Sequence, residues 1–375
     1  MNMKFHAAAL AAAFLVFSCG SPAAENERIP DENEITEPQD DTQQENGNDG
    51  SGDPGSGGTG SGTARTDPYD PAKKPDPGVI EEPLVVLPRP QLTVMFYVTD
   101  TTGGHYIDRI KGAAVEYAGY TPQYDNGCEG WESFNGVSVR NISEFARMDV
   151  YFPAGEPDGK MVIICPGGSY SMVADVFEGM AGAYYLNPNG TTVGVLKYRL
   201  PNKTAAEAPV EDVLNAIRYS RSKASEWHIG KIGVLGTSAG GDKADFGVLL
   251  YPVITMGEGA HSDTRTNLLG YSSKYGSADE YAAAKVYYSQ EKNVSPETPV
   301  TLVMYSENDG AVLPDYNGKA FYDALTENGT GSSVHVFPGG GHGWGFGTVE
   351  LRGSDNIAEW RDDFFDVLFQ FISSL

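Results

Sequence analysis

The stretch from Gly230 to Val253, GKIGVLGTSAGGDKADFGVLLYPV, decides the fold. Two continuous apolar runs, at 231–236 and 246–253, are typical of strands buried on both faces of a parallel sheet. Between them, Gly236-Thr237-Ser238-Ala239-Gly240 fits G-x-S-x-G, a tight turn in which larger residues beside the serine would collide. We therefore expect Ser238 to lie above the end of a central strand, in the position of a nucleophile.

Similar apolar runs recur along the chain, with helical patterns between them. In residues 208–222 the apolar side chains follow the i, i+3, i+4, i+7 spacing of a helix laid on a sheet, and residues 357–372 show a similar stripe. Strand, helix and strand in repetition predict an α/β fold with a doubly wound, mostly parallel sheet. The other predicted central strands are Met161–Cys165, Thr192–Tyr198 and Val300–Tyr305.

The first 83 residues are expected to lie outside the folded domain. Residues 1–18 contain Lys4 and an apolar run that is typical of a signal peptide and too short to span a membrane. Cys19 directly follows LVFS, which resembles a bacterial lipoprotein signal, so we expect Cys19 to carry lipid; the alternative is an ordinary signal peptide with a chance cysteine. Residues 19–83 form an acidic, Gly/Ser-rich linker. Residues 84–375 form the α/β domain, in which 91–152 are N-terminal strands and an irregular insertion.

Nearly half of the formal net charge of −25 lies in the linker, where residues 21–82 hold 16 acidic and 4 basic side chains, a net −12. This excess of acid argues against a nucleic acid as partner. The chain has three cysteines, and a disulfide between Cys128 and Cys165 is one reading, whereas a buried strand cysteine is commonly a small apolar side chain. No motif has metal-ligand spacing, so neither a metal nor a cofactor is expected.

A serine hydroxyl is a weak nucleophile without a base, so the turn at Ser238 calls for a histidine and an acid. His342 lies in a glycine-rich loop, PGGGHGWGF, suited to placing an imidazole at the sheet edge, while His335 alternates within a strand and is expected to be structural. The acid should follow the strand Val300–Tyr305. Asp309 is preferred there over Glu307, which is expected to be solvated.

An oxyanion site needs two backbone N–H groups directed at the developing negative charge. Ala239, the residue after the serine, is expected to supply one. The loop CPGGSY is expected to supply the other from Gly167 or Gly168, because glycine allows the backbone to approach a substrate closely.

Six segments carry a resemblance to a known family: VIICPGGSY, VLKYRLP, APVEDVLNAIRYSRSKASEWHIGKIGVLGTSAGG, FGVLLYPVITM, HSDTRTNLLG and VHVFPGGGHGWGF. Together, from about Ile142 to the C-terminus, they resemble the esterase/lipase branch of the α/β-hydrolase superfamily, and most of all bacterial acetylesterases that deacetylate xylan and related plant glycans. In this superfamily the triad follows the order Ser, Asp or Glu, His. The resemblance implies Ser238 as nucleophile, Asp309 as the orienting acid and His342 as general base.

The chain departs from the family in its oxyanion loop, where Ser169 replaces a third glycine, and more strongly after Gly241. There the family has a helix packed on the sheet, whereas nine residues, 237–245, separate the two predicted strands. A parallel crossover generally needs about a dozen residues or more. Nine helical residues reach only about 14 Å, so the return must be mostly extended, and one flank of the sheet is expected to lose cover.

The sequence therefore predicts a serine carboxylesterase that deacetylates plant-type polysaccharides or oligosaccharides, exported and lipid-anchored on the periplasmic side or the cell surface. Its partners would be an acetylated glycan or small ester and, through the lipid, the membrane; the oligomeric state has no signal in the sequence. Residues 261–290 are expected to overhang the site. The alternative is a weakened or inactive hydrolase-fold lipoprotein that binds glycan, which the short crossover favours. A peptidase of related fold is disfavoured because no second large domain is apparent.

Overall fold

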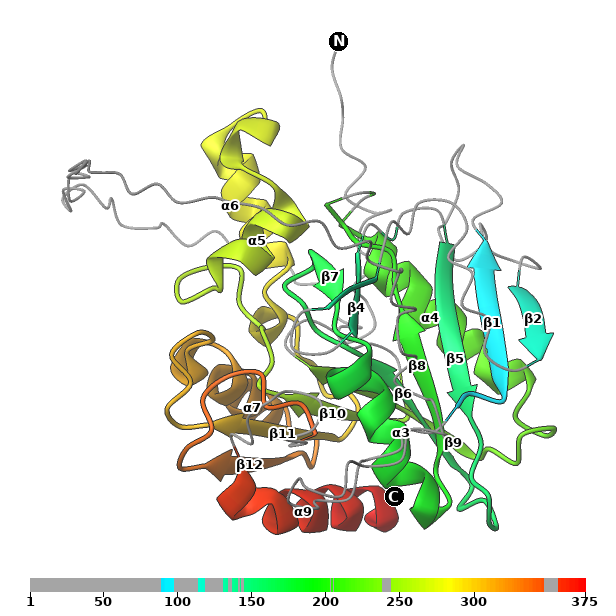
Figure 1. Ribbon diagram of the computed structural model, residues 1–375. Helices are drawn as coiled ribbons and strands as arrows, with labels where there is room; N and C mark the ends of the chain where they lie inside the picture. Colours follow the sequence, from blue (N-terminus) through cyan, green and yellow to red (C-terminus); the bar gives the residue numbers. More distant parts are fainter. Residues whose placement is uncertain are drawn as a thin grey trace, which may run out of the picture.

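The computed structural model describes residues 89–97, 114–118, 131–133, 137–140, 142, 145–202, 204, 206–237, 244–346 and 357–375. The main sheet is built from β1 (Leu92–Tyr97), β2 (Ala114–Ala118), β5 (Phe145–Tyr151), β6 (Lys160–Cys165), β8 (Thr192–Lys197), β9 (Lys231–Thr237), β10 (Phe246–Leu250), β11 (Thr301–Ser306) and β12 (Ser333–Phe337). Their order is β12-β11-β10-β9-β6-β8-β5-β1-β2 (Figure 1).

Neighbouring strands from β12 to β8 pair in parallel, and β5, β1 and β2 extend the sheet with antiparallel pairs. This arrangement confirms the predicted mostly parallel α/β sheet, and the predicted N-terminal strands join it in antiparallel pairs. Three short strands lie within the segment expected to be irregular: β2 at the sheet edge, and β3 (Trp131–Ser133) and β4 (Val137–Arg140), which form a second small sheet with β7 (Met172–Val173). Their apolar runs are too short to signal strands on their own, and pairing with neighbouring strands defines them.

Helices cover both faces of the sheet. On one face, α3 (Ala181–Leu186) and α9 (Arg361–Ser374) share a core cluster with Leu235 and Val248. On the other, α4 (Ala208–Ser222) packs on Val234, and α7 (Gly318–Glu327) packs on Leu249. The remaining helices, α5 (Ser262–Leu269) and α6 (Ala278–Tyr287), project beyond the sheet (Figure 1). Short helical turns are η1 (Val176–Met180), η2 (Asn187–Asn189), η3 (Ser272–Lys274), η4 (Gln290–Lys292), η5 (Pro314–Tyr316) and η6 (Ala358–Trp360).

The connection from β9 to β10 is short, as expected. The two strands are parallel, with Phe246 level with Gly233. Just before β10, the Asp245 N–H donates to the Ile232 carbonyl at 2.7 Å, and the Ile232 N–H donates to Asp245 Oδ2 at 2.8 Å. The chain therefore returns by about five residues along the strand, or roughly 17 Å, between Thr237 and Asp245. Residues 238–243 of this connection lie outside the described residues.

The face that carries α4 and α7 has a gap between these helices. A cavity of about 100 Å³ lies there, with a mainly apolar lining that includes Val213 of α4, Val234 of β9, Leu249 of β10 and Phe321 of α7. In the part of the chain that the structure describes, no helix stands between α4 and α7 over β9 and β10. This gap agrees with the expectation that a shortened crossover leaves one flank of the sheet with less cover.

A cluster of buried charges joins β5, β8 and the loop before η1. Asp149 is fully buried and accepts a hydrogen bond from Arg147 Nε at 2.8 Å, while Lys197 pairs with Asp149 and lies 3.6 Å from Asp175. Although burial opposes ionisation, Lys197 and Arg147 hold the pKa of Asp149 below its usual value. Burial raises the pKa of Asp175 to about 6, despite the nearby Lys197. The neighbouring cations therefore outweigh the cost of burying the charge of Asp149, but not that of Asp175.

Several predictions from the sequence concern residues that the structure does not describe: the signal segment 1–18, Cys19, the linker and Cys128. Cys165 is a free thiol at the end of β6, so the disulfide considered for it is not formed. Burial raises the pKa of Cys165 to about 12, which fits its role as a small apolar side chain. No described helix is both long and apolar enough to cross a membrane.

Candidate active site

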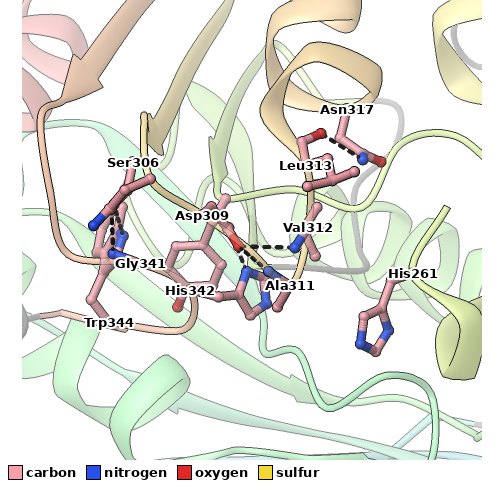
Figure 2. A network of polar contacts seen from close by, with 12 residues as sticks. His261, Ser306, Asp309, Ala311, Val312, Leu313, Asn317, Gly341, His342 and Trp344 are labelled. Carbon is pink, nitrogen blue, oxygen red and sulfur yellow. Dashed lines mark hydrogen bonds and ion pairs between the residues drawn. The ribbon is translucent and has the colours of Figure 1, made fainter. Parts of the chain in front are cut away.

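A histidine and an aspartate that are far apart in sequence meet at the carboxyl ends of the parallel strands. His342 Nδ1 lies 2.7 Å from Asp309 Oδ2 (Figure 2). Asp309 comes from the loop after β11, and His342 from the loop after β12. In this position Asp309 accepts the Nδ1 proton, which leaves the lone pair of a neutral imidazole on Nε2. The arrangement is that of a general base held by an acid.

The backbone fixes the aspartate from the side opposite to the histidine. Asp309 is 3% exposed, and its Oδ1 accepts N–H groups from Ala311 at 3.0 Å and Val312 at 2.8 Å (Figure 2). Both oxygens of Asp309 therefore have donors, and the carboxylate cannot rotate without losing them. Glu307, two residues earlier, is exposed, as the sequence predicted.

The loop around His342 owes its shape to glycines. Gly340, Gly341, Gly343 and Gly345 all have positive φ values, between 57° and 109°, a region that other residues rarely adopt. Beyond the histidine, the buried Trp344 donates from Nε1 to Ser306 Oγ at 3.0 Å and so ties this loop to the end of β11 (Figure 2).

His335 takes no part in this site. It lies on β12, where its Nε2 is 2.8 Å from Asp363 Oδ2 of α9. This contact agrees with the structural role expected for His335.

Ser238 and Ala239 lie outside the described residues, so the structure is silent on their contacts. The described chain stops one residue earlier, at Thr237, the last residue of β9. Thr237 Oγ1 accepts the N–H of Gly167 at 2.7 Å, which joins the end of β9 to the loop after β6. The chain therefore enters the G-x-S-x-G motif directly beside the predicted oxyanion loop.

The two glycines predicted for the oxyanion loop differ in their contacts. The N–H of Gly167 already has two acceptors, Glu178 Oε2 and Thr237 Oγ1, each at 2.7 Å, so this group holds the loop in place and is not available to a substrate. No described residue accepts a hydrogen bond from the N–H of Gly168. Gly168 has φ +136°, and an added Cβ would lie 2.4 Å from the Met172 carbonyl oxygen. Of the pair, Gly168 is thus the better candidate, and only glycine fits there.

Sequence analysis missed a buried glutamate that connects the loops of the site. Glu178, on η1, is 4% exposed; its Oε2 accepts from the Gly167 N–H and the Thr237 hydroxyl, and its Oε1 accepts from the Tyr251 hydroxyl at 2.8 Å. The Tyr251 oxygen in turn accepts the N–H of Gly345, in the histidine loop, at 2.9 Å. One feature of the sequence could have indicated this role, because Glu178 is the lone acid in the apolar stretch 176–186.

Tyr251 also supports the histidine directly. Its ring meets the ring of His342 edge to face, with centroids 4.9 Å apart, and its backbone has a positive φ of 39° just beyond β10. A second histidine, His261, lies beside the His342–Asp309 pair at the start of α5 (Figure 2). Both residues lie in segments that carry the family resemblance, but the sequence assigned neither a role, and the folded chain brings them to His342.

Comparisons with known proteins agree with this geometry. A family model described as BD-FAE matches residues 148–252, a range that includes the predicted oxyanion loop and the G-x-S-x-G motif. An acetylxylan esterase of Xylanibacter ruminicola is 33% identical over 219 residues, which cover 54% of this chain and 44% of the relative. Endo-1,4-beta-xylanase B of Butyrivibrio fibrisolvens is 29% identical over 211 residues, covering 48% and 32%. The chain thus spans less than half the length of either curated relative.

Solved structures show the same architecture. An acetyl ester-xyloside bifunctional hydrolase from Caldicellulosiruptor lactoaceticus matches with a TM-score of 0.51 and 25% identity, over 60% of this chain and 88% of that one. A sugar hydrolase from Lactococcus lactis matches with a TM-score of 0.51 and 22% identity, over 61% and 95%. With the strand order and the loops described above, these likenesses lead to one conclusion: the chain has the fold of the α/β-hydrolase superfamily and is similar to members of its esterase branch.

Proposed function

We propose that the protein is a serine carboxylesterase that removes acetyl groups from sugars of plant-type glycans. The observation that carries the proposal is the 2.7 Å contact between His342 Nδ1 and Asp309 Oδ2, at the sheet edge where β9 leads into Ser238. The named activity of the acetylxylan esterase relative supports the choice of an acetylated sugar as substrate.

In the proposed reaction, Ser238 Oγ attacks the acetyl carbonyl while His342 Nε2 takes its proton. The N–H groups of Ala239 and Gly168 stabilise the negative oxygen of the tetrahedral intermediate. His342 then returns the proton to the sugar oxygen, and the alcohol leaves. Water attacks the acetyl-enzyme with the same histidine as base and releases acetate. Asp309 remains ionised and stabilises the imidazolium in both steps.

The test is hydrolysis of p-nitrophenyl acetate by the full chain, beside the variant Ser238→Ala, together with labelling by a fluorophosphonate. We expect turnover and labelling in the wild type and neither in Ser238→Ala. Equal turnover in both proteins would show that Ser238 is not the nucleophile. The second candidate is a glycan-binding protein without catalysis, which the short crossover after β9 favours. A folded wild-type chain that neither hydrolyses the ester nor reacts with the probe would support it.

We further propose that Cys19 carries lipid and holds the protein on a bacterial membrane, on the periplasmic side or at the cell surface. The sequence LVFS before Cys19 supports this proposal. Partition of the expressed chain into the detergent phase of Triton X-114, lost in Cys19→Ala, is the expected result. An unchanged partition of that variant would refute lipid attachment at this residue.

A further inference from the structure

His261 caps a helix that begins beside the His342–Asp309 pair. It is the N-cap of α5, and its ring lies beside His342 and Asp309, with which it interacts electrostatically (Figure 2). The other half of α5 reaches the oxyanion loop, where Asn267 Nδ2 donates to the Ser169 carbonyl at 2.8 Å. The helix therefore begins near the His342–Asp309 pair and contacts the predicted oxyanion loop through Asn267, which agrees with the expected overhang.

The position of α5 is fixed by packing as well as by this hydrogen bond. The helix residues Thr264, Leu268 and Leu269 are buried, and Arg265 Nη1 donates to the Gly257 carbonyl at 3.1 Å. These contacts fix the position of α5 and therefore the backbone of His261. The contacts of its imidazole with Thr264 orient the ring.

Those contacts use one ring nitrogen. His261 Nδ1 accepts the Thr264 N–H at 3.4 Å and lies 2.9 Å from Thr264 Oγ1. Because a nitrogen that accepts an N–H cannot carry the proton of a neutral imidazole, the proton lies on Nε2. No described residue forms a hydrogen bond with Nε2. Burial lowers the pKa of His261, which favours the neutral ring with this single outward donor.

We propose that His261 binds the alcohol part of the ester, donating its Nε2–H to a hydroxyl oxygen on the carbon next to the esterified one. The inference rests on the proposed esterase function and adds to it a residue that selects esters of polyols. His342 must reach the ester oxygen that leaves, and His261 is its neighbour on the side of α5. A vicinal hydroxyl, which a monoacetylated sugar carries, would then meet the Nε2–H donor.

The experiment compares two acetates that differ in a single hydroxyl, 2-hydroxyethyl acetate and ethyl acetate. For each full-chain protein, kcat/KM is measured on both esters, and their ratio is the readout. His261→Asn keeps a good N-cap for α5 while removing the Nε2 donor. Ser262→Ala, an exposed change at the next position, is the matched control.

We expect the wild type to have a higher kcat/KM on 2-hydroxyethyl acetate than on ethyl acetate. In His261→Asn the ratio of the two values should fall about tenfold, because one hydrogen bond to the substrate is lost. Ser262→Ala should keep the wild-type ratio. An unchanged ratio in His261→Asn, or an equal loss on both esters, would mean that His261 only caps α5 and would overturn the inference. Failure of the wild type to hydrolyse either ester would instead overturn the proposed function, and the inference with it.

Discussion

Removing the Glu178 carboxylate tests whether this residue holds the loops of the site together. In the wild type it accepts from the Gly167 N–H and from the hydroxyls of Thr237 and Tyr251. In Glu178→Ala, Gly167 keeps a second acceptor in Thr237 Oγ1. The two buried hydroxyls, however, lose the acceptor that they have in this cluster.

The cost follows from those two hydroxyls. A buried donor left without its partner costs roughly 1 to 3 kcal/mol, so two cost about 4 kcal/mol, before any contribution from the space left by the side chain. A domain of ordinary stability has about 5 to 15 kcal/mol in total. We therefore expect Glu178→Ala to fold but to lose a large share of its free energy of unfolding.

Urea unfolding at 25 °C, followed by tryptophan fluorescence and far-ultraviolet circular dichroism, measures this free energy. Glu178→Gln, which keeps one oxygen acceptor, should lose about half as much, roughly 2 kcal/mol. Glu156→Ala is the control, because Glu156 is exposed and its side chain has no hydrogen bond in the described part of the chain. A loss below about 1 kcal/mol in Glu178→Ala would refute the argument, because one unsatisfied buried donor alone costs that much.

Three further predictions follow from individual contacts. Asp309→Asn should lower kcat/KM by about 10⁴-fold, because the amide no longer holds His342 in the productive tautomer; exposed Glu307→Gln is the control, and a loss under tenfold would contradict the role of Asp309. Gly168→Ala should abolish esterase activity, because its Cβ would collide with the Met172 carbonyl; wild-type kinetics would exclude this loop geometry. Asp175 has a pKa of about 6 when folded, above its unfolded value of about 4, so ionisation destabilises the native state as pH rises from 4 to 6. Against Asp175→Asn, the wild type should lose about 2 kcal/mol of unfolding free energy between pH 4 and 7, and a difference that stays constant with pH would show that Asp175 does not titrate in this way.

The contact between Asp309 and His342 was predictable because the sequence features that mark both residues are local. Asp309 follows a strand that is apolar throughout, and His342 lies in a loop whose glycines mark positive φ values. In a parallel sheet the loops after neighbouring strands meet at one edge, so the strand pattern already places these two residues near each other. Asp309, and not the exposed Glu307, contacts His342, and the turn that follows Asp309 supplies the N–H groups that its carboxylate accepts.

The predicted oxyanion loop could be recognised from local sequence only in part. PGGSY indicates a turn that approaches the substrate, but the sequence treats Gly167 and Gly168 alike. They are distinguished by Glu178, 11 residues away, and Thr237, 70 residues away, whose oxygens take the N–H of Gly167. A hydrogen bond over such a separation has no periodicity, so no pattern in the chain predicts it.

The sequence by itself determined the α/β class, the parallel strands, the helix α4 and the loops that carry Asp309 and His342, because strand and helix periods and turn-forming glycines are properties of adjacent residues. Only the tertiary structure decided that Glu178 joins the loops of the site, that His261 is the residue of 261–290 that lies beside His342, and that the less covered flank of the sheet lies between α4 and α7. These features depend on which distant side chains packing brings within about 3 Å of one another. That is set by the whole sheet and the helices on it rather than by any one segment.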